Sequence, residues 1–354
     1  MKSIIVTSTK PYTGKSGIAL TLIGMLTDLG HEVGYFKPYG TMPVLADGVL
    51  TDEDALYINR TLARPAAIES ICPVVRSQGF VEALLAGDPP PAHDGVLRAF
   101  ATCADGRDLM VIEGPTEPAQ GAAAGLSVPA VAEMFDARVL LIDRPKPNDL
   151  PEDALAVGRQ LGDRLAGVVL NGIDESRLPV TRDRIAPFLA AHGLPVFGVI
   201  PYDPELGSVT VAEIVDALGA TVLTAADRLA GTVESFMVGA MGQEKALRFF
   251  RRKARKAVIT GGDRADVQLA ALETNTRCII LTGSLPPSPV VASRAEELGV
   301  PMLLVETDTL TAVERMDALI GRIRLHDRAK AGRIRELFER DVDTQRLMAA
   351  FGID

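Results

Sequence analysis

The stretch that decides the fold is residues 9–16, which read TKPYTGKS. It follows an apolar run at residues 3–7, which predicts a strand, and it precedes a helical pattern at residues 15–29 that Gly30 ends. A loop between a strand and a helix N-terminus presents backbone N–H groups to an anion. The sequence Gly14-Lys15-Ser16 adds a lysine for the outer phosphates and a hydroxyl for Mg²⁺, as a P-loop requires.

The loop departs from the P-loop pattern at its first position, where Thr9 stands in place of the leading glycine. Pro11 also removes one N–H donor from the turn. The alternative is an ordinary helix start with a solvated Lys15, but the position directly after the first strand favours phosphate binding. We therefore predict a nucleotide-binding site whose residues are Thr13, Gly14, Lys15, Ser16 and Gly17. If the protein is an enzyme, Lys15 is also expected to be a catalytic residue.

Carboxylates that suit Mg²⁺ occur at two further places. Glu113 comes directly after an apolar run at residues 109–112, at the carboxyl end where parallel sheets bind ligands. Asp52 and Asp54 lie at a predicted loop-to-helix junction, where a helix cap or a first-turn acid is the ordinary alternative. Because Mg²⁺ prefers hard oxygen ligands, Ser16, Glu113 and one of the two aspartates form a plausible metal site.

Two other polar residues end predicted strands. Lys37 follows residues 32–36, and at a strand end it would point into the ligand crevice, where it could neutralise a carboxylate or phosphate. A solvated lysine is the alternative. Asn171 follows residues 167–170 and could read a base edge, because its amide both donates and accepts hydrogen bonds. Its alternative is a turn residue, since Asn-Gly is a common turn dipeptide.

Apolar runs alternate with helical patterns along the rest of the chain, which predicts an α/β fold with buried parallel strands. A second, smaller series of strands lies at residues 257–260, 278–282 and 301–305. We expect a P-loop sheet flanked by helices at residues 1–222, a smaller α/β domain at 223–326 and a charged C-terminal helix at 327–354.

Composition narrows the class of protein. The net charge of −9 over 354 residues argues against a nucleic-acid partner. No run of 18 apolar residues occurs, so neither a membrane span nor a secretory signal is expected. The three scattered cysteines argue for a reducing compartment, so a cytoplasmic location is expected. The one basic cluster, residues 248–256, is better explained as a helix that buries two phenylalanines than as an anion-binding surface.

Taken together, the altered P-loop, Phe36-Lys37-Pro38, Asp54-Ala55-Leu56, Ile112-Glu113-Gly114 and Asn171 resemble the dethiobiotin synthetase-like branch of P-loop proteins. The resemblance implies that the cofactor is MgATP. It assigns MgATP binding to Lys15, Ser16, Asp54 and Glu113, and it puts Asn171 near adenine and Lys37 near a substrate. It also implies a homodimer, in which Lys10 could reach the partner's nucleotide; a solvated Lys10 is the alternative.

The second series of strands resembles a DRTGG domain, on the sequence at residues 258–264 (VITGGDR) and Leu281-Thr282-Gly283. Asp263 and Arg264 follow a Gly-Gly turn, where they could bind an effector at a helix N-terminus or simply form a structural turn. The order of the two domains is that of the N-terminal regulatory region of long bacterial phosphate acetyltransferases. Because the chain stops at Asp354 after one charged tail, no phosphate acetyltransferase activity is expected.

Two functions remain open. The first is a MgATP-binding regulatory or sensor protein that couples its nucleotide state to the DRTGG unit, to an effector or to a partner protein, with at most weak ATP hydrolysis. The second is an ATP-dependent ligase of the dethiobiotin synthetase type that acts on a small carboxylic acid, with Lys37 as a catalytic residue. The fused second domain and the altered P-loop favour the sensor.

Overall fold

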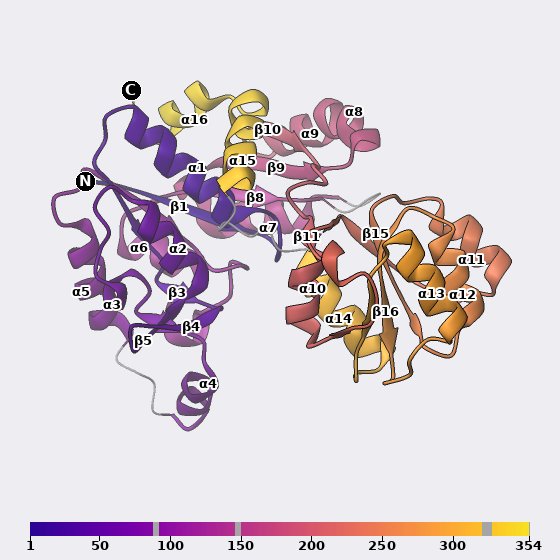
Figure 1. Ribbon diagram of the computed structural model, residues 1–354. Helices are drawn as coiled ribbons and strands as arrows, with labels where there is room; N and C mark the ends of the chain where they lie inside the picture. The colour runs from indigo at the N-terminus through magenta and orange to yellow at the C-terminus, as the bar shows by residue number, and fades with distance from the viewer. Residues whose placement is uncertain (88–91, 146–149, 321–327, 354) are drawn as a thin grey trace. The chain divides into compact units, whose positions relative to one another are not determined.

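The computed structural model describes residues 1–87, 92–145, 150–320 and 328–353. The chain forms two compact units (Figure 1). Unit 1 comprises Met1–Tyr202 together with Leu325–Asp354, and unit 2 comprises Asp203–Arg324. Both are α/β, as the sequence predicts. The division after Tyr202 differs from the expected boundary at 222, and the C-terminal segment does not stand apart as a third domain.

A parallel six-stranded sheet forms the centre of unit 1, in the order β10-β9-β8-β1-β7-β2. Its strands are buried along most of their length because helices cover both faces, which explains their near-continuous apolar sequences. The strands are β1 (Lys2–Ser8), β2 (Val33–Phe36), β7 (Leu109–Glu113), β8 (Arg138–Asp143), β9 (Leu165–Ile173) and β10 (Val196–Pro201).

Helices and two small strand pairs complete the N-terminal part of unit 1. The strand pairs are β3 (Tyr39–Gly40) with β6 (Val74–Val75), and β4 (Pro43–Ala46) with β5 (Val49–Asp52). The helices are α1 (Lys15–Asp28), α2 (Glu53–Thr61), α3 (Ile68–Ile71), α4 (Gln78–Leu85), α5 (Ala92–Ala104), α6 (Val128–Met134), α7 (Glu152–Leu161), α8 (Leu178–Val180) and α9 (Ala186–Ala191).

Two helices at the end of the chain pack onto unit 1. Helix α15 (Arg328–Asp341) contacts α1 and β10, and α16 (Thr344–Ala350) contacts β9 and β10, as the yellow and indigo helices in Figure 1 show. Phe338 and Leu347 are fully buried there. Although this segment carries many charges, it therefore also has an apolar face, and that face packs against unit 1. The expected start of this segment, between 326 and 327, falls outside the described residues.

Unit 2 contains a five-stranded sheet in the order β12-β17-β16-β15-β14. Four strands are parallel, and β12 pairs antiparallel to β17 at one edge. The strands are β12 (Thr221–Val222), β14 (Ser235–Val238), β15 (Lys256–Gly261), β16 (Thr276–Thr282) and β17 (Met302–Leu304), and β11 (Val209–Thr210) pairs separately with β13 (Thr232–Val233). The helices are α10 (Val211–Leu218), α11 (Gln243–Phe250), α12 (Ala265–Leu272), α13 (Pro289–Leu298) and α14 (Thr309–Ile320).

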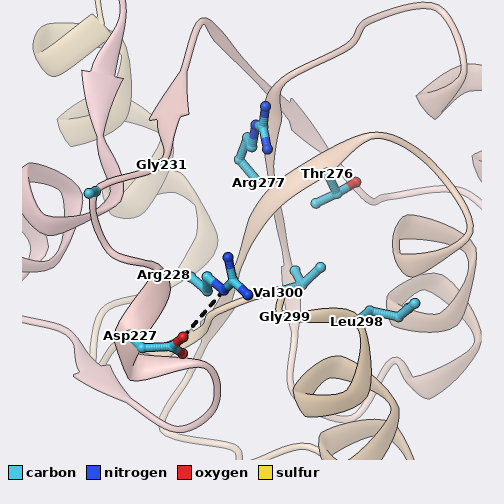
Figure 2. Close-up of a pocket in the computed structure, with 9 residues that line it drawn as sticks. Asp227, Arg228, Gly231, Thr276, Arg277, Leu298, Gly299 and Val300 are labelled. Atoms are coloured by element: carbon cyan, nitrogen blue, oxygen red, sulfur yellow. Dashed lines mark ion pairs between the residues drawn. The ribbon is translucent and has the colours of Figure 1, made fainter.

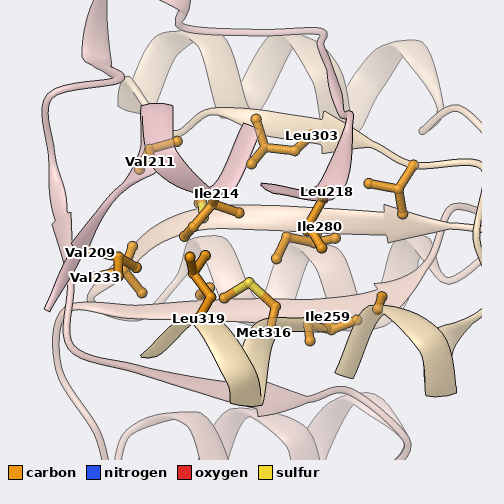
Figure 3. Packing of buried hydrophobic residues seen from close by; sticks show 14 residues of the cluster. Val209, Val211, Ile214, Leu218, Val233, Ile259, Ile280, Leu303, Met316 and Leu319 are labelled. Carbon is orange, nitrogen blue, oxygen red and sulfur yellow. The ribbon is translucent and has the colours of Figure 1, made fainter. Parts of the chain in front are cut away.

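The sheet of unit 2 has one apolar core on each face. Alternate residues of β15 and β16 point to opposite sides, so α10 and α14 cover one face while α11, α12 and α13 cover the other. Figure 3 shows the first core, where Ile214 and Leu218 of α10 pack with Met316 of α14. This packing explains why the boundary precedes α10: the helix buries its apolar face in unit 2, and helical periodicity alone does not indicate which sheet a helix will cover.

Candidate functional site

The predicted phosphate-binding loop lies between β1 and α1. The backbone N–H of Thr9 donates to the carbonyl of Ile142, and its hydroxyl donates to Asp143, which ties the loop to the end of β8. Gly14 precedes α1 with φ +86°, a left-handed conformation that glycine adopts without strain. Tyr12 also has a positive φ, +59°, which is uncommon for a bulky residue. The loop therefore turns sharply into the N-terminus of α1.

Lys15 and Ser16 of this loop meet Glu113 of β7. Glu113 is the last residue of a strand that pairs with β1, in register with Val6, and its side chain is fully buried. Lys15 Nζ forms an ion pair with Glu113, and Ser16 Oγ donates to Glu113 Oε1 at 2.9 Å. The parallel pairing thus brings a strand-end carboxylate onto the first turn of α1.

Asp54 and Asp52 have different surroundings although both belong to the start of α2. The Ser16 hydroxyl shares its single hydrogen between Glu113 and Asp54, whose Oδ2 lies 3.1 Å away, and within the described residues this is the one hydrogen bond that the Asp54 carboxylate accepts. Asp52 accepts from the backbone N–H groups of its neighbours and caps α2; these donors belong to Thr41, Met42, Asp54 and Ala55. Asp54 is therefore the aspartate with oxygens available to a ligand.

Lys37 is buried rather than open to a crevice. Its ammonium lies 2.7 Å from Asp52 Oδ1 and 3.1 Å from Glu113 Oε1, and 4% of the residue is exposed. The structure thus places the predicted substrate lysine between two carboxylates of its own chain. Such a buried ion pair orients Glu113 and Asp52 relative to each other.

The buried charges change one another's pKa values. Burial alone would raise the pKa of Glu113, but Lys15 and Lys37 outweigh burial and lower it below its ordinary value. Burial would lower the pKa of Lys37, yet Glu113 and Asp52 raise it well above its usual range. The pKa of Asp54 is raised, mainly by burial, because the attraction of Lys37 does not compensate fully.

Tyr35 is a member of this cluster that the sequence interpretation missed. Its hydroxyl donates to Glu113 Oε2 at 2.9 Å, while Oε1 faces Ser16 and Lys37. Burial, and then the charge of Glu113, raise the pKa of the Tyr35 phenol well above its ordinary value, so it remains a donor. Its position two residues before Lys37, on the same side of an extended chain, was an available signal, because a buried tyrosine needs a hydrogen-bond partner.

The remaining predicted nucleotide residues also lie at this edge of the sheet. Asn171 Nδ2 donates to the carbonyl of Thr13 at 2.6 Å, which joins the end of β9 to the loop. Gly17 lies buried in the first turn of α1. Lys10 forms an ion pair with Asp153 of α7 at 2.6 Å.

The predicted effector residues lie in unit 2, between β15 and α12. Arg264 Nη2 donates to the carbonyl of Met241 at 2.9 Å, and Arg264 Nε lies 3.4 Å from Asp266. Asp263 is exposed. An added Cβ on Gly262 would lie 1.6 Å from the carbonyl oxygen of Leu285, so this glycine permits a close backbone approach. Close packing against Leu285 is therefore a structural reason for the glycine in this turn.

The oxygen donors beside the loop fit Mg²⁺. The Ser16 hydroxyl lies within hydrogen-bonding distance of the Asp54 and Glu113 carboxylates, and all three groups offer hard oxygen ligands. Within the described ranges, no group of three or more His, Cys, Asp and Glu side chains has the geometry of a metal site. Mg²⁺ is commonly held by one or two carboxylates together with phosphate oxygens and water, which is the arrangement this donor set could support.

Comparison with known families identifies both units. Residues 2–210 match the family AAA_26, described as an AAA domain, and residues 213–319 match the DRTGG domain. None of the helices in the described part of the chain has the length and apolarity needed to cross a membrane.

The chain is similar to curated phosphate acetyltransferases and to a dethiobiotin synthetase. The chain is 26% identical over 351 residues to a phosphate acetyltransferase of Pseudomonas putida, covering 94% of this chain and 49% of the relative. It is 26% identical over 216 residues to the ATP-dependent dethiobiotin synthetase BioD of Bacillus licheniformis, covering 57% of this chain and 86% of the relative. The chain thus spans about half the length of the phosphate acetyltransferases that it matches.

Among solved structures, the CBS and DRTGG domains of the regulatory region of Clostridium perfringens pyrophosphatase align at 20% identity and a TM-score of 0.28, over 51% of this chain and 72% of that one. The MinD cell division protein of Aquifex aeolicus aligns at 17% identity and a TM-score of 0.35, over 58% of this chain and 84% of that one.

Proposed function

This chain belongs to the AAA domain family and carries a DRTGG domain, and from that premise we propose that it is a MgATP-binding regulatory protein. In this proposal, nucleotide binding at the P-loop of unit 1 is coupled to unit 2, which binds an effector or a partner protein. The relationship to the N-terminal half of phosphate acetyltransferases supports a regulatory role, because the match covers nearly all of this chain and about half of those enzymes.

The observation that carries the proposal is the convergence of Lys15, Ser16 and Glu113 at the N-terminus of α1. The free N–H groups and the dipole of α1 favour a phosphate group at this point. Phosphate oxygens would compete with Glu113 for the Lys15 ammonium. Glu113 and Asp54 would then be free to hold Mg²⁺, which supplies positive charge to the phosphates when bound.

The charges of the cluster support this arrangement. The two ammonium groups of Lys15 and Lys37 face three carboxylates, which leaves a formal charge of −1 when all five groups are ionised; the carboxylates are those of Asp52, Asp54 and Glu113. A divalent cation is attracted to such a group. Burial is the main cause of the raised pKa of Asp54, and the negative charges of Glu113 and Asp52 add to it. Beside a bound phosphate group, the cluster can therefore accept a cation more readily than another anion.

Ligase activity on a small carboxylic acid is the second candidate, because a dethiobiotin synthetase is among the relatives. Its substrate lysine would be Lys37. The ion pairs of Lys37 with Asp52 and Glu113 favour the regulatory role, since an ammonium already paired with two carboxylates offers little to a third. A ligase predicts that a carboxylic acid stimulates phosphate release from ATP and that Lys37→Ala abolishes the stimulation.

Hydrogen exchange on the full chain tests the coupling. MgATP is expected to slow amide exchange in the loop at residues 9–16 and to change exchange within residues 203–324. Lys15→Ala is expected to lose both effects. Protection of the loop with unchanged exchange throughout residues 203–324 would contradict coupling while leaving nucleotide binding intact.

We further propose a homodimer that works in the cytoplasm. The three cysteines, Cys72, Cys103 and Cys278, are free and buried, which suits a reducing compartment. Sedimentation equilibrium with and without MgATP tests the assembly: a mass of twice 37.6 kDa supports the dimer, and a monomer under both conditions contradicts it.

A further inference from the structure

Unit 2 contains a cavity of about 550 Å³ at the amino ends of β16 and β17 (Figure 2). Thr276 and Arg277 begin β16, and Gly299 and Val300 lie just before β17. The turn that carries Asp263 and Arg264 follows the carboxyl end of β15. Because the three strands are parallel, the cavity and that turn lie at opposite ends of the sheet. The cavity is therefore a separate place for a ligand.

Two arginines line the cavity, and together they face one carboxylate. Arg228 Nε lies 3.3 Å from Asp227, but both side chains are mostly exposed, so this pair is weak. Figure 2 shows the Arg228 side chain reaching toward Gly299, whose added Cβ would lie 3.6 Å from its Nε. In the described part of the chain, Arg277 has no carboxylate within ion-pair distance and is exposed. One guanidinium of the cavity is thus uncompensated.

A buried lysine adds positive charge beside the cavity. Lys256 begins β15 in register with Thr276, and it is fully buried. Its ammonium donates to Thr274 Oγ1 at 2.9 Å and to the carbonyl of Asn275 at 3.1 Å, and none of its hydrogen bonds within the described residues goes to a carboxylate. Burial lowers the pKa of Lys256 to about 8, so it is still mainly protonated at neutral pH. Lys256 thus adds a positive charge close to the start of β16, where Thr276 and Arg277 line the cavity.

We propose that this cavity binds a small polyvalent oxyanion, a phosphate or carboxylate compound, with Arg228 and Arg277 as its charged contacts. The planar guanidinium group matches both kinds of oxyanion and can bind them in a bidentate manner. The cavity volume lies within the usual range of small-molecule sites. Leu298 and Val300 supply an apolar wall for the organic part of the ligand. The proposal does not rest on the nucleotide function, because the residues that line the cavity all belong to unit 2.

Calorimetric titration of the full chain tests this site, with sodium tripolyphosphate and citrate as the two probes. The titrations use a Lys15→Ala background, so that the P-loop does not contribute. We expect saturable binding of at least one probe. Binding of tripolyphosphate alone assigns a phosphate compound, and binding of citrate alone assigns a carboxylate compound. Saturation by neither probe would overturn the proposal.

The arginines are tested by the double change Arg228→Ala, Arg277→Ala, with Arg294→Ala as the control. Arg294 is an exposed arginine of the same unit that does not line the cavity. We expect at least tenfold weaker binding in the double variant and less than a twofold change in the control. Arg277→Gln, which keeps a long polar side chain, is expected to weaken binding at least threefold. Equal affinity in the double variant and the control would overturn the proposal, whereas MgATP affinity in the Lys15-containing protein should be unaffected by either change.

Discussion

The hydroxyl of Ser16 lies 2.9 Å from Oε1 of Glu113, although 97 positions separate the two residues in the chain. The parallel pairing of β1 with β7 explains this distance, because it sets the last residue of β7 beside the strand that leads into the loop. The same carboxylate receives the Lys15 ammonium and the Tyr35 hydroxyl. Glu113 is therefore the residue on which the candidate site converges.

Asp54→Asn is expected to weaken the effect of Mg²⁺ on ATP binding. The substitution removes a negative charge that faces Ser16 but breaks no ion pair, so the protein should remain folded. The Mg²⁺-dependent gain in ATP affinity should fall about tenfold, the lower range for loss of a partner in a metal site. Titrations of ATP with and without Mg²⁺ measure this, and Glu53→Gln in the same helical turn is the control. A full Mg²⁺ effect in Asp54→Asn would rule this residue out as a ligand.

Asp52→Asn is expected to reduce stability instead. Within the described residues, the Asp52 carboxylate meets only donors, so an amide NH₂ group would face the Lys37 ammonium or a backbone N–H. Breaking one side of a buried ion pair costs about 3 kcal/mol. Urea denaturation measures the change, and Asp47→Asn, at an exposed turn, should leave stability nearly unaltered. A loss of less than about 1 kcal/mol would show that Asp52 does not organise the start of α2.

Glu113 makes stability depend on acid pH. Lys15 and Lys37 lower its pKa in the folded protein, so the unfolded chain takes up the proton first as the pH falls. The stabilisation is complete above the ordinary value of 4.5 and is lost progressively below it, toward the lower pKa of the folded state. The stability advantage of the wild type over Glu113→Gln should therefore shrink below pH 4.5 in urea titrations. Glu117→Gln, at an exposed position, should show no such trend; a constant difference for Glu113→Gln would contradict the assignment.

Gly262→Ala should destabilise unit 2. The added methyl group would lie 1.6 Å from the Leu285 carbonyl oxygen, which belongs to the backbone and cannot turn away. Overpacking of this kind costs about 1–3 kcal/mol. The control is Gly242→Ala, since nothing lies within 4 Å of its added Cβ. Thermal unfolding, followed by hydrogen exchange in residues 203–324, measures the difference in stability between the two variants. Equal stability would mean that the turn at Gly262 does not pack against Leu285 as described.

Much of the architecture could be predicted from the chain because buried parallel strands have a strong sequence pattern. Long apolar runs such as residues 139–142 were recognisable without their partners. The placement of α10 and of α15 was not predictable, because periodicity shows that a helix has an apolar face but not which sheet that face will cover. Phe338, for example, belongs to the apolar face of α15, and only the structure shows that this face is buried in unit 1.

The candidate site was partly predictable. The motif around Lys15 and the strand-end position of Glu113 indicated residues that the structure brings together, although their role in binding MgATP stays a prediction. Asp52 and Asp54 could not be told apart in sequence, since both suit a helix start, and the backbone donors of Asp52 separate them. The burial of Lys37 was not predictable, because a strand-end lysine has the same sequence pattern whether it is paired or solvated.

The central claim is that the loop at residues 9–16 binds MgATP through Lys15. Calorimetric titration of ATP with Mg²⁺ into the wild type, Lys15→Ala and the exposed-lysine control Lys245→Ala tests it most directly. The account predicts saturable binding in the wild type and the control, and affinity lowered more than tenfold in Lys15→Ala, a loss of more than about 1.4 kcal/mol. Unchanged affinity in Lys15→Ala, or no binding to the wild type, would contradict it.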